Sequence, residues 1–101
     1  MKNDYKSRME KLLGSDGKNL ILNDSVAKDL YKMYNKDGNY FNRVKKVVYK
    51  ICNNPDQSEK LTGPLTGHRS THAGSKVLIF QYRNGNVYLE KIDEHDKAYH
   101  I

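Results

Sequence analysis

The dipeptide Asn84-Gly85 lies between two β-forming segments and is the strongest hairpin signal in the chain. Both residues tolerate positive φ, so a two-residue type I′ turn forms there at little cost and matches the twist of the strands on either side. This turn fixes the register of the two strands. The pairs that follow from it are Gln81 with Tyr88, Ile79 with Glu90, and Lys76 with Asp93.

The run from Val77 to Phe80 is continuously apolar, which is typical of a strand covered on both faces, so it is predicted to be central in a sheet. A central strand needs a second neighbour. The segment 67–72 is predicted to pair antiparallel with it through the turn-like trio 73–75, which places His72 near Lys76. The side chains then expected to gather at one end of the sheet are His72, Lys76, Asp93 and His95.

The other elements follow from helical periodicity and from turn residues. They are a helix over 4–13, a strand over 20–22, a helix capped by Asp24 or Ser25, a helix over 40–52, a polar connector over 57–66, and a tail over 94–101 with one helical turn. Together they predict an α+β domain, in which an antiparallel sheet packs on two helices and an extra helix precedes it.

Composition limits what this domain can be. The 101 residues, 37% of them hydrophobic, suffice for one small domain with a modest core. The net charge of +6 favours a polyanionic partner, nucleic acid before a membrane, although many small basic proteins bind no polyanion.

Cysteine usage and hydropathy indicate the compartment. Cys52 is the single cysteine, so no intramolecular disulfide forms, and its place at the end of an apolar helical stripe predicts a buried, inert thiol. No apolar run of membrane-spanning length and no signal peptide are evident in the sequence, so a cytoplasmic protein is expected.

Basic residues line the polar surface of the second long helix. Lys45, Lys46 and Lys50 are candidates for contact with RNA phosphate, and so is Arg83 beside the hairpin turn. A solvated outer face accounts for the three lysines equally well.

Two histidines at one end of a basic sheet indicate acid–base chemistry on a phosphodiester. Cleaving RNA without a metal requires a base for the 2′-hydroxyl, an acid for the departing 5′-oxygen, and cations near the phosphorus. His72 and His95 suit the proton transfers, because imidazole exchanges a proton near neutral pH. Lys76 and Arg69 are candidates to stabilise charge, and Tyr99 to contact the phosphate or stack on a base.

A zinc site is the alternative for these histidines. Its ligands would come from His68, His72, His95 and Asp96. A pair of histidines four residues apart on a strand lacks the spacing of helical zinc sites, and cysteine partners are missing from the sequence. Neither a metal nor another cofactor is therefore predicted.

From Leu20 onward, over about four-fifths of the chain, the sequence resembles the RelE/ParE superfamily of type II toxin–antitoxin toxins, and most closely the YafQ-like branch. The resemblance rests on the order and spacing of several short segments. They are the start Leu20-Ile-Leu-Asn-Asp-Ser-Val-Ala-Lys-Asp-Leu30, Leu61-Thr-Gly63, Gly67-His-Arg-Ser-Thr-His72, the strand Val77-Leu-Ile-Phe80, and Glu94-His-Asp-Lys-Ala-Tyr99. It divides the chain into an N-terminal helical extension, 1–17, and a RelE-like toxin domain, 18–101.

The resemblance implies a ribosome-dependent mRNA endonuclease. Such a toxin is a monomer within a complex with its antitoxin, enters the ribosomal A site, cuts mRNA without a metal and thereby inhibits translation. His72 matches the family's strand histidine, His95 its C-terminal histidine, Tyr99 the aromatic residue near the end, and Arg69 a recurrent basic position.

Two positions depart from the YafQ-like pattern. Where the branch has a histidine before its Leu-x-Gly segment, this chain has Glu59 or Lys60, and Lys76 stands where the branch has an acid. Glu59 is therefore a candidate base, as a glutamate is in the YoeB branch, and Lys76 a candidate charge stabiliser, as lysines are in RelE.

Two other functions fit the same fold. A ParE-like inhibitor of DNA gyrase shares it without this nuclease chemistry, and the two C-terminal histidines favour the nuclease. A non-catalytic module that binds RNA or protein is the other alternative.

Overall fold

The structure is a computed structural model that describes residues 5–14 and 19–94. The predicted hairpin forms between β4 (Lys76–Arg83) and β5 (Asn86–Glu94). Its two loop residues, Asn84 and Gly85, have φ values of 54° and 79°, as a type I′ turn requires. Next to the turn the strands pair in the predicted register.

Further along the hairpin a β-bulge shifts the register by one residue. Phe80 pairs with Leu89, but Ile79 pairs with Lys91, so Glu90 is the extra residue of β5. The predicted pair of Ile79 with Glu90 is therefore wrong. The prediction for Lys76 is also wrong, because Lys76 pairs with Glu94 in place of Asp93.

Core packing explains the bulge. Leu89 and Ile92 are both buried against the helices, although they are three positions apart along β5. Strict alternation would point residues at this spacing to opposite faces of the sheet. One inserted residue between them lets both side chains enter the same core.

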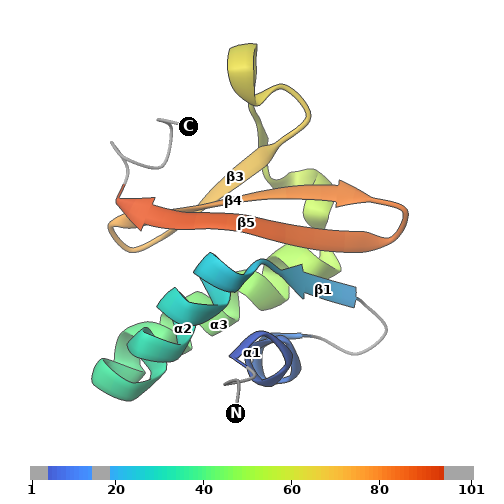
Figure 1. The fold of residues 1–101 in the computed structure, drawn as a ribbon. Helices are drawn as coiled ribbons and strands as arrows, with labels where there is room; N and C mark the ends of the chain where they lie inside the picture. Colours follow the sequence, from blue (N-terminus) through green and yellow to red (C-terminus); the bar gives the residue numbers. More distant parts are fainter. Residues whose placement is uncertain (1–4, 15–18, 95–101) are drawn as a thin grey trace.

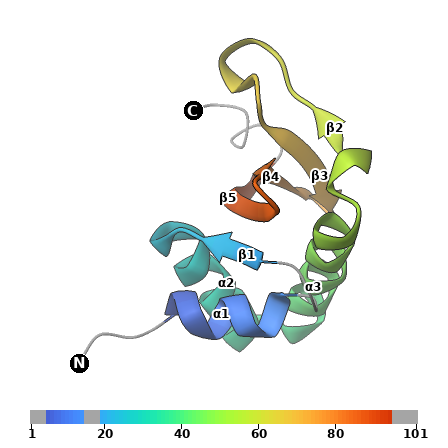
Figure 2. The ribbon, with the colours of Figure 1, turned by 90° about the vertical axis from the view of Figure 1, so that its right-hand side faces the viewer.

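Within the described residues the sheet has five strands in the order β1-β5-β4-β3-β2. Figure 2 shows β2 beside β3. The edge strands are β1 (Asn19–Leu22) and β2 (Glu59–Lys60), and β3 (Arg69–Ala73) lies between β4 and β2. The antiparallel pairing of β3 with β4 is confirmed. The sheet is mixed and not wholly antiparallel, because β1 runs parallel to β5. The short strand β2 was not predicted.

Helices α1 (Tyr5–Leu13), α2 (Asp24–Lys36) and α3 (Gly38–Asn53) lie on one side of the sheet (Figures 1 and 2). The N-cap of α2 is Asn23, one residue before the predicted cap, and its side chain accepts a hydrogen bond from the Val26 amide at 2.8 Å. The α+β architecture is confirmed.

Strand β4 is central and covered on both faces, as its apolar run predicts. Its residues Val77 to Phe80 have no exposed surface. Leu78 and Phe80 pack on the helices, whereas Val77 and Ile79 pack on Leu65. Leu65 belongs to η2 (Gly63–Leu65), a short 3₁₀ helix in the loop that crosses the opposite face of the sheet.

α1 is part of the main core. Met9 and Leu13 are 0% and 1% exposed and pack in one cluster with α2 and α3. A Glu10 carboxylate oxygen accepts a hydrogen bond from the Leu22 amide at 2.9 Å, so α1 also satisfies the outer edge of β1. The predicted helix over 4–13 is confirmed for its described part.

Cys52 is buried in the same core, as predicted. In the described ranges, no helix is both long and apolar enough to cross a membrane.

Gly74, in the turn between β3 and β4, is required by close packing and by its φ of +65°. A Cβ atom there would lie 3.0 Å from an Arg43 Nη1 atom and 3.1 Å from the ring of Tyr40, whose hydroxyl donates to the Ala73 carbonyl. We expect Gly74→Ala to lower the free energy of unfolding by about 2–4 kcal/mol, from backbone strain plus overpacking.

The matched control is Gly85→Ala. Gly85 has a similar φ of +79° but no heavy atom within 4 Å of a built Cβ, so the backbone strain of about 1–2 kcal/mol acts alone. Urea denaturation measures both variants, and equal losses would contradict a packing role for Gly74.

Candidate functional site

The C-terminal half of α3 lies beside the β2–β3 edge of the sheet (Figure 2). Residues of these elements line a groove of about 610 Å³. Its lining comes from the C-terminal half of α3, from the turn that precedes β2, from Glu59, and from β3. The lining residues are Val47, Lys50, Ile51, Asn54, Gln57, Ser58, Glu59, Ser70, Thr71 and His72. Three of the predicted site residues, Lys50, Glu59 and His72, thus line one groove.

Strand register places Glu59 and His72 on the same face of the sheet. Glu59 pairs with Ser70, and His72 is two residues further along β3. Such diagonal neighbours lie about 7–8 Å apart at backbone level, which long side chains can span. Both residues are exposed, so a ligand in the groove can reach a carboxylate and an imidazole together.

Lys50 comes from the other wall of the groove. It is exposed on α3, together with Lys45 and Lys46, and it adds a positive charge to the lining of the groove. The lining therefore includes a carboxylate, an imidazole and an ammonium group, side chains of the types that transfer protons and stabilise negative charge.

Lys76 does not join this set. His72 pairs with Val77, and Lys76 pairs with Ala73, so the side chains of His72 and Lys76 point to opposite faces of the sheet. Lys76 lies on the helix side, where it lines a small cavity with Met33 of α2 and forms a 3.3 Å ion pair with Glu94. The predicted proximity of the two side chains is wrong.

Arg69 stabilises the segment before β2 that lines one side of the groove. Its side chain is 16% exposed, and the guanidinium donates hydrogen bonds to the carbonyls of Asp56 and Ser58 at 3.2 and 3.0 Å. These bonds fix the turn η1 (Pro55–Gln57) and the residue after it, and Gln57 and Ser58 line the groove. A contact of Arg69 with phosphate stays a prediction.

Arg83 lies at the other end of β4. Its guanidinium packs over the Tyr88 ring at 4.4 Å from the ring centre. It is six positions along β4 from Val77, the partner of His72, which corresponds to roughly 20 Å. Arg83 is therefore distant from the groove. His95 and Tyr99, together with the predicted helical turn of the tail, lie outside the described residues.

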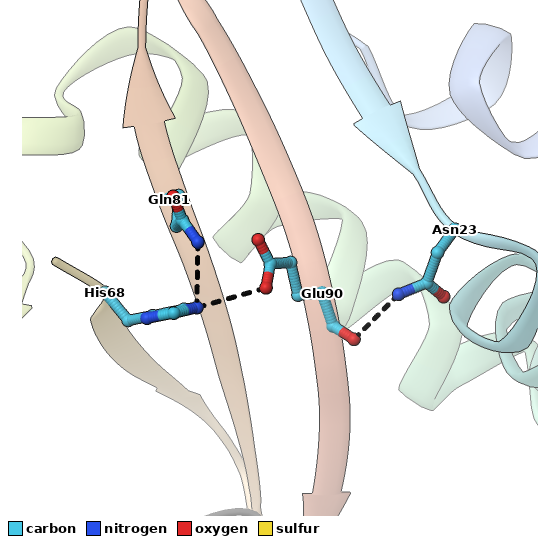
Figure 3. A network of polar contacts seen from close by, with 4 residues as sticks. All are labelled: Asn23, His68, Gln81 and Glu90. Carbon is cyan, nitrogen blue, oxygen red and sulfur yellow. Dashed lines mark hydrogen bonds and ion pairs between the residues drawn. The ribbon is translucent and has the colours of Figure 1, made fainter. Parts of the chain in front are cut away.

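A polar network on the sheet face opposite the helices was not predicted (Figure 3). His68 Nε2 lies 3.0 Å from a Glu90 carboxylate oxygen and 3.0 Å from the Gln81 side-chain amide, and the Glu90 carbonyl accepts a hydrogen bond from Asn23 at 3.0 Å. The bulge turns Glu90 toward His68. The spacing of the apolar residues Leu89 and Ile92 in the sequence is the signal that could have revealed the bulge.

Both the Gln81 side-chain nitrogen and a Glu90 carboxylate oxygen contact Nε2 of His68. This ring nitrogen accepts from Gln81 or donates to Glu90, according to the tautomer of the imidazole. Within the described residues, Nδ1 of His68 is buried without a partner. His68 thus fastens the end of the η2 loop to the sheet and is positioned as a structural residue.

Sequence comparisons identify partial relatives. No family model matches the chain. It is 38% identical over 88 residues to diaminopimelate epimerases from two strains of Methanococcus maripaludis. The alignment covers 80% of this chain but 29% of each enzyme, so the chain spans less than a third of the length of these relatives.

Structural comparisons identify the fold. A YoeB–YefM complex from Staphylococcus aureus matches with a TM-score of 0.67 and 15% identity, over 77% of this chain and 97% of the matched one. A mutant of YafQ from E. coli matches with a TM-score of 0.64 and 16% identity, over 81% of this chain and 98% of the other. The predicted RelE-like architecture is thereby confirmed, and the protein has the fold of the RelE/YafQ-like toxins.

Proposed function

We propose that this protein is the toxin of a type II toxin–antitoxin system and acts as a metal-independent endoribonuclease on mRNA in the ribosomal A site. One observation carries the proposal: Glu59, His72 and Lys50 line a single groove on a RelE/YafQ-like fold. Acid–base groups beside a cation suit the cleavage of a phosphodiester.

The reaction is a transesterification within the RNA. A base removes the proton of a 2′-hydroxyl, whose oxygen attacks the adjacent phosphorus, while the 5′-oxygen leaves and takes a proton from an acid. The products are a 2′,3′-cyclic phosphate and a 5′-hydroxyl. His72 is one of the two proton-transfer groups, Glu59 or His95 is the other, and Lys50 stabilises the negative charge that develops on the phosphate oxygens.

The proposed partners follow from the same reasoning. The matched S. aureus structure is a complex of YoeB with YefM, which supports an antitoxin partner for this chain. Ribosomal RNA and mRNA are the proposed polyanions, in agreement with the net charge of +6. The proposed state is a monomeric cytoplasmic toxin that an antitoxin silences.

The direct test uses the purified protein with ribosomes programmed with a defined mRNA. We expect cuts within the A-site codon and slower cleavage of the same mRNA without ribosomes. Supercoiling by DNA gyrase, measured in parallel, should be unaffected. Inhibition of gyrase without mRNA cuts would favour a ParE-like activity, and neither effect would favour a binding module.

The likeness to diaminopimelate epimerase defines a second candidate activity. Because the chain spans 29% of those enzymes, the similarity concerns a part of them. We expect no epimerisation of diaminopimelate by the purified protein, and turnover would overturn the nuclease proposal in favour of the second candidate.

We also expect cleavage to be independent of divalent metal. In this proposal protons and positive charge come from side chains. The assay on ribosomes cannot test this, because its buffer contains magnesium. A minimal RNA at high protein concentration, with and without chelator, gives the measurement. Equal rates agree with the proposal, and a loss with chelator that added metal restores would contradict it.

A further inference from the structure

α3 carries a strongly basic outer face. Its 16 residues include Arg43, Lys45, Lys46 and Lys50 and no Asp or Glu, and all four cations are exposed. Such a surface without interspersed acids attracts a polyanion. We call Lys45, Lys46, Tyr49 and Lys50 the α3 face.

Tyr49 is the unusual member of this face. It is 58% exposed, the most exposed of the large hydrophobic side chains in the described part of the chain. Within the same residues its ring makes no stacking or cation–π contact, whereas Tyr31 and Tyr88 each pack against an arginine. A planar ligand can stack on the exposed face of such a ring.

Helix geometry places cations on both sides of that ring. Lys45 and Lys46 precede Tyr49 by four and three residues, so they are its neighbours on the preceding turn, about 5–6 Å away at Cβ. Lys46 is in turn four residues from Lys50, which lines the groove. Lys50, Lys46 and Lys45 therefore form a row of positive charges from the groove to Tyr49.

We propose that the α3 face binds single-stranded RNA, with one nucleobase stacked on Tyr49 and the flanking phosphates on the lysines. The inference rests on the proposed nuclease function, because it describes how RNA outside the groove is held. A cationic surface alone would serve any polyanion, but an aromatic ring between cations matches unpaired nucleotides, whose bases are free to stack. An acidic peptide offers charge without a stacking group.

The experiment measures binding to a single-stranded 2′-O-methyl oligonucleotide by fluorescence anisotropy. This probe lacks a free 2′-hydroxyl and is not cleaved, so binding is separated from catalysis. We expect Tyr49→Ala to weaken binding roughly 5- to 150-fold, which is the contribution of one stacked base. Tyr49→Phe and Tyr49→Trp should bind nearly as well as the wild type, because stacking needs the ring and not the hydroxyl.

Salt dependence distinguishes stacking from charge. Tyr49→Ala should leave the slope of log affinity against log salt unchanged, whereas Lys46→Ala should reduce the slope by about 0.7, the value for one phosphate contact on a single strand. The matched control is Tyr82→Ala on β4, another exposed tyrosine, at 36%. It should bind like the wild type.

Several results would overturn the inference. One is that the wild type does not bind the single strand, or binds it no more tightly than Tyr49→Ala does. Another is that the wild type binds the duplex form of the probe as tightly as the single strand. A third is that Tyr49→Ala weakens binding to polyglutamate as much as it weakens binding to the probe. Failure of the proposed function reads differently: the wild type would then leave unmodified mRNA uncut on ribosomes, whatever its affinity for the uncleavable probe.

Discussion

Replacing His72 with alanine should reduce the rate of mRNA cleavage by about 10²–10⁴-fold, the usual contribution of one general acid or base. His72 is exposed in the groove, on the same face as Glu59 and opposite Lys50. Its loss removes a proton-transfer group without opening a cavity in the core. The measurement is the single-turnover rate on ribosomes programmed with mRNA.

The matched control for His72 is Lys76→Ala. Lys76 lies at the same end of the sheet, but on the helix side and in an ion pair with Glu94. An exposed pair of this kind contributes little to stability, so the variant should fold and cleave nearly as the wild type. Equal losses of activity in the two variants would show that the groove is not the catalytic site.

The second large effect should come from Met9. We expect Met9→Ala to lower the free energy of unfolding by about 2–5 kcal/mol, because the side chain has no exposed surface and its removal leaves a cavity between α1 and the rest of the core. A small domain has about 5–15 kcal/mol in total, so this loss is a large part of it. Urea denaturation followed by circular dichroism gives the value.

Leu12→Ala is the control within the same helix. Leu12 is 39% exposed, so the loss should stay well below that of Met9→Ala. Small, equal effects would mean that α1 is an appendage. The solved toxins match 77–81% of this chain and nearly all of their own length, so a segment of this chain has no counterpart in them. The expected result would make α1, the helix of the predicted extension 1–17, structurally part of the toxin-like domain.

The hairpin was predictable because its signal is local. Asn84 and Gly85 each adopt the positive φ that their residue types favour, and the flanking strands follow. The bulge was not predicted, because the register was extended with a strict period of two. The buried pair Leu89 and Ile92 shows that the core decided the register instead, and Glu90 was turned out as a result.

The candidate site was predictable in composition and only partly in geometry. Residue types and the family resemblance identified Glu59 and His72, but the groove that unites them with Lys50 depends on where α3 crosses the sheet edge. No local pattern shows that crossing. His72 pairs with Val77, the residue after Lys76. This difference of one residue places the side chains of His72 and Lys76 on opposite faces of the sheet.

The central claim is best tested by mapping mRNA ends after induced expression in a bacterial host, with wild type and His72→Ala side by side. The proposed function predicts growth arrest by the wild type, discrete cuts within codons that end in a 2′,3′-cyclic phosphate, and loss of both arrest and cuts in the variant. Arrest that persists in His72→Ala without cuts in mRNA would contradict it.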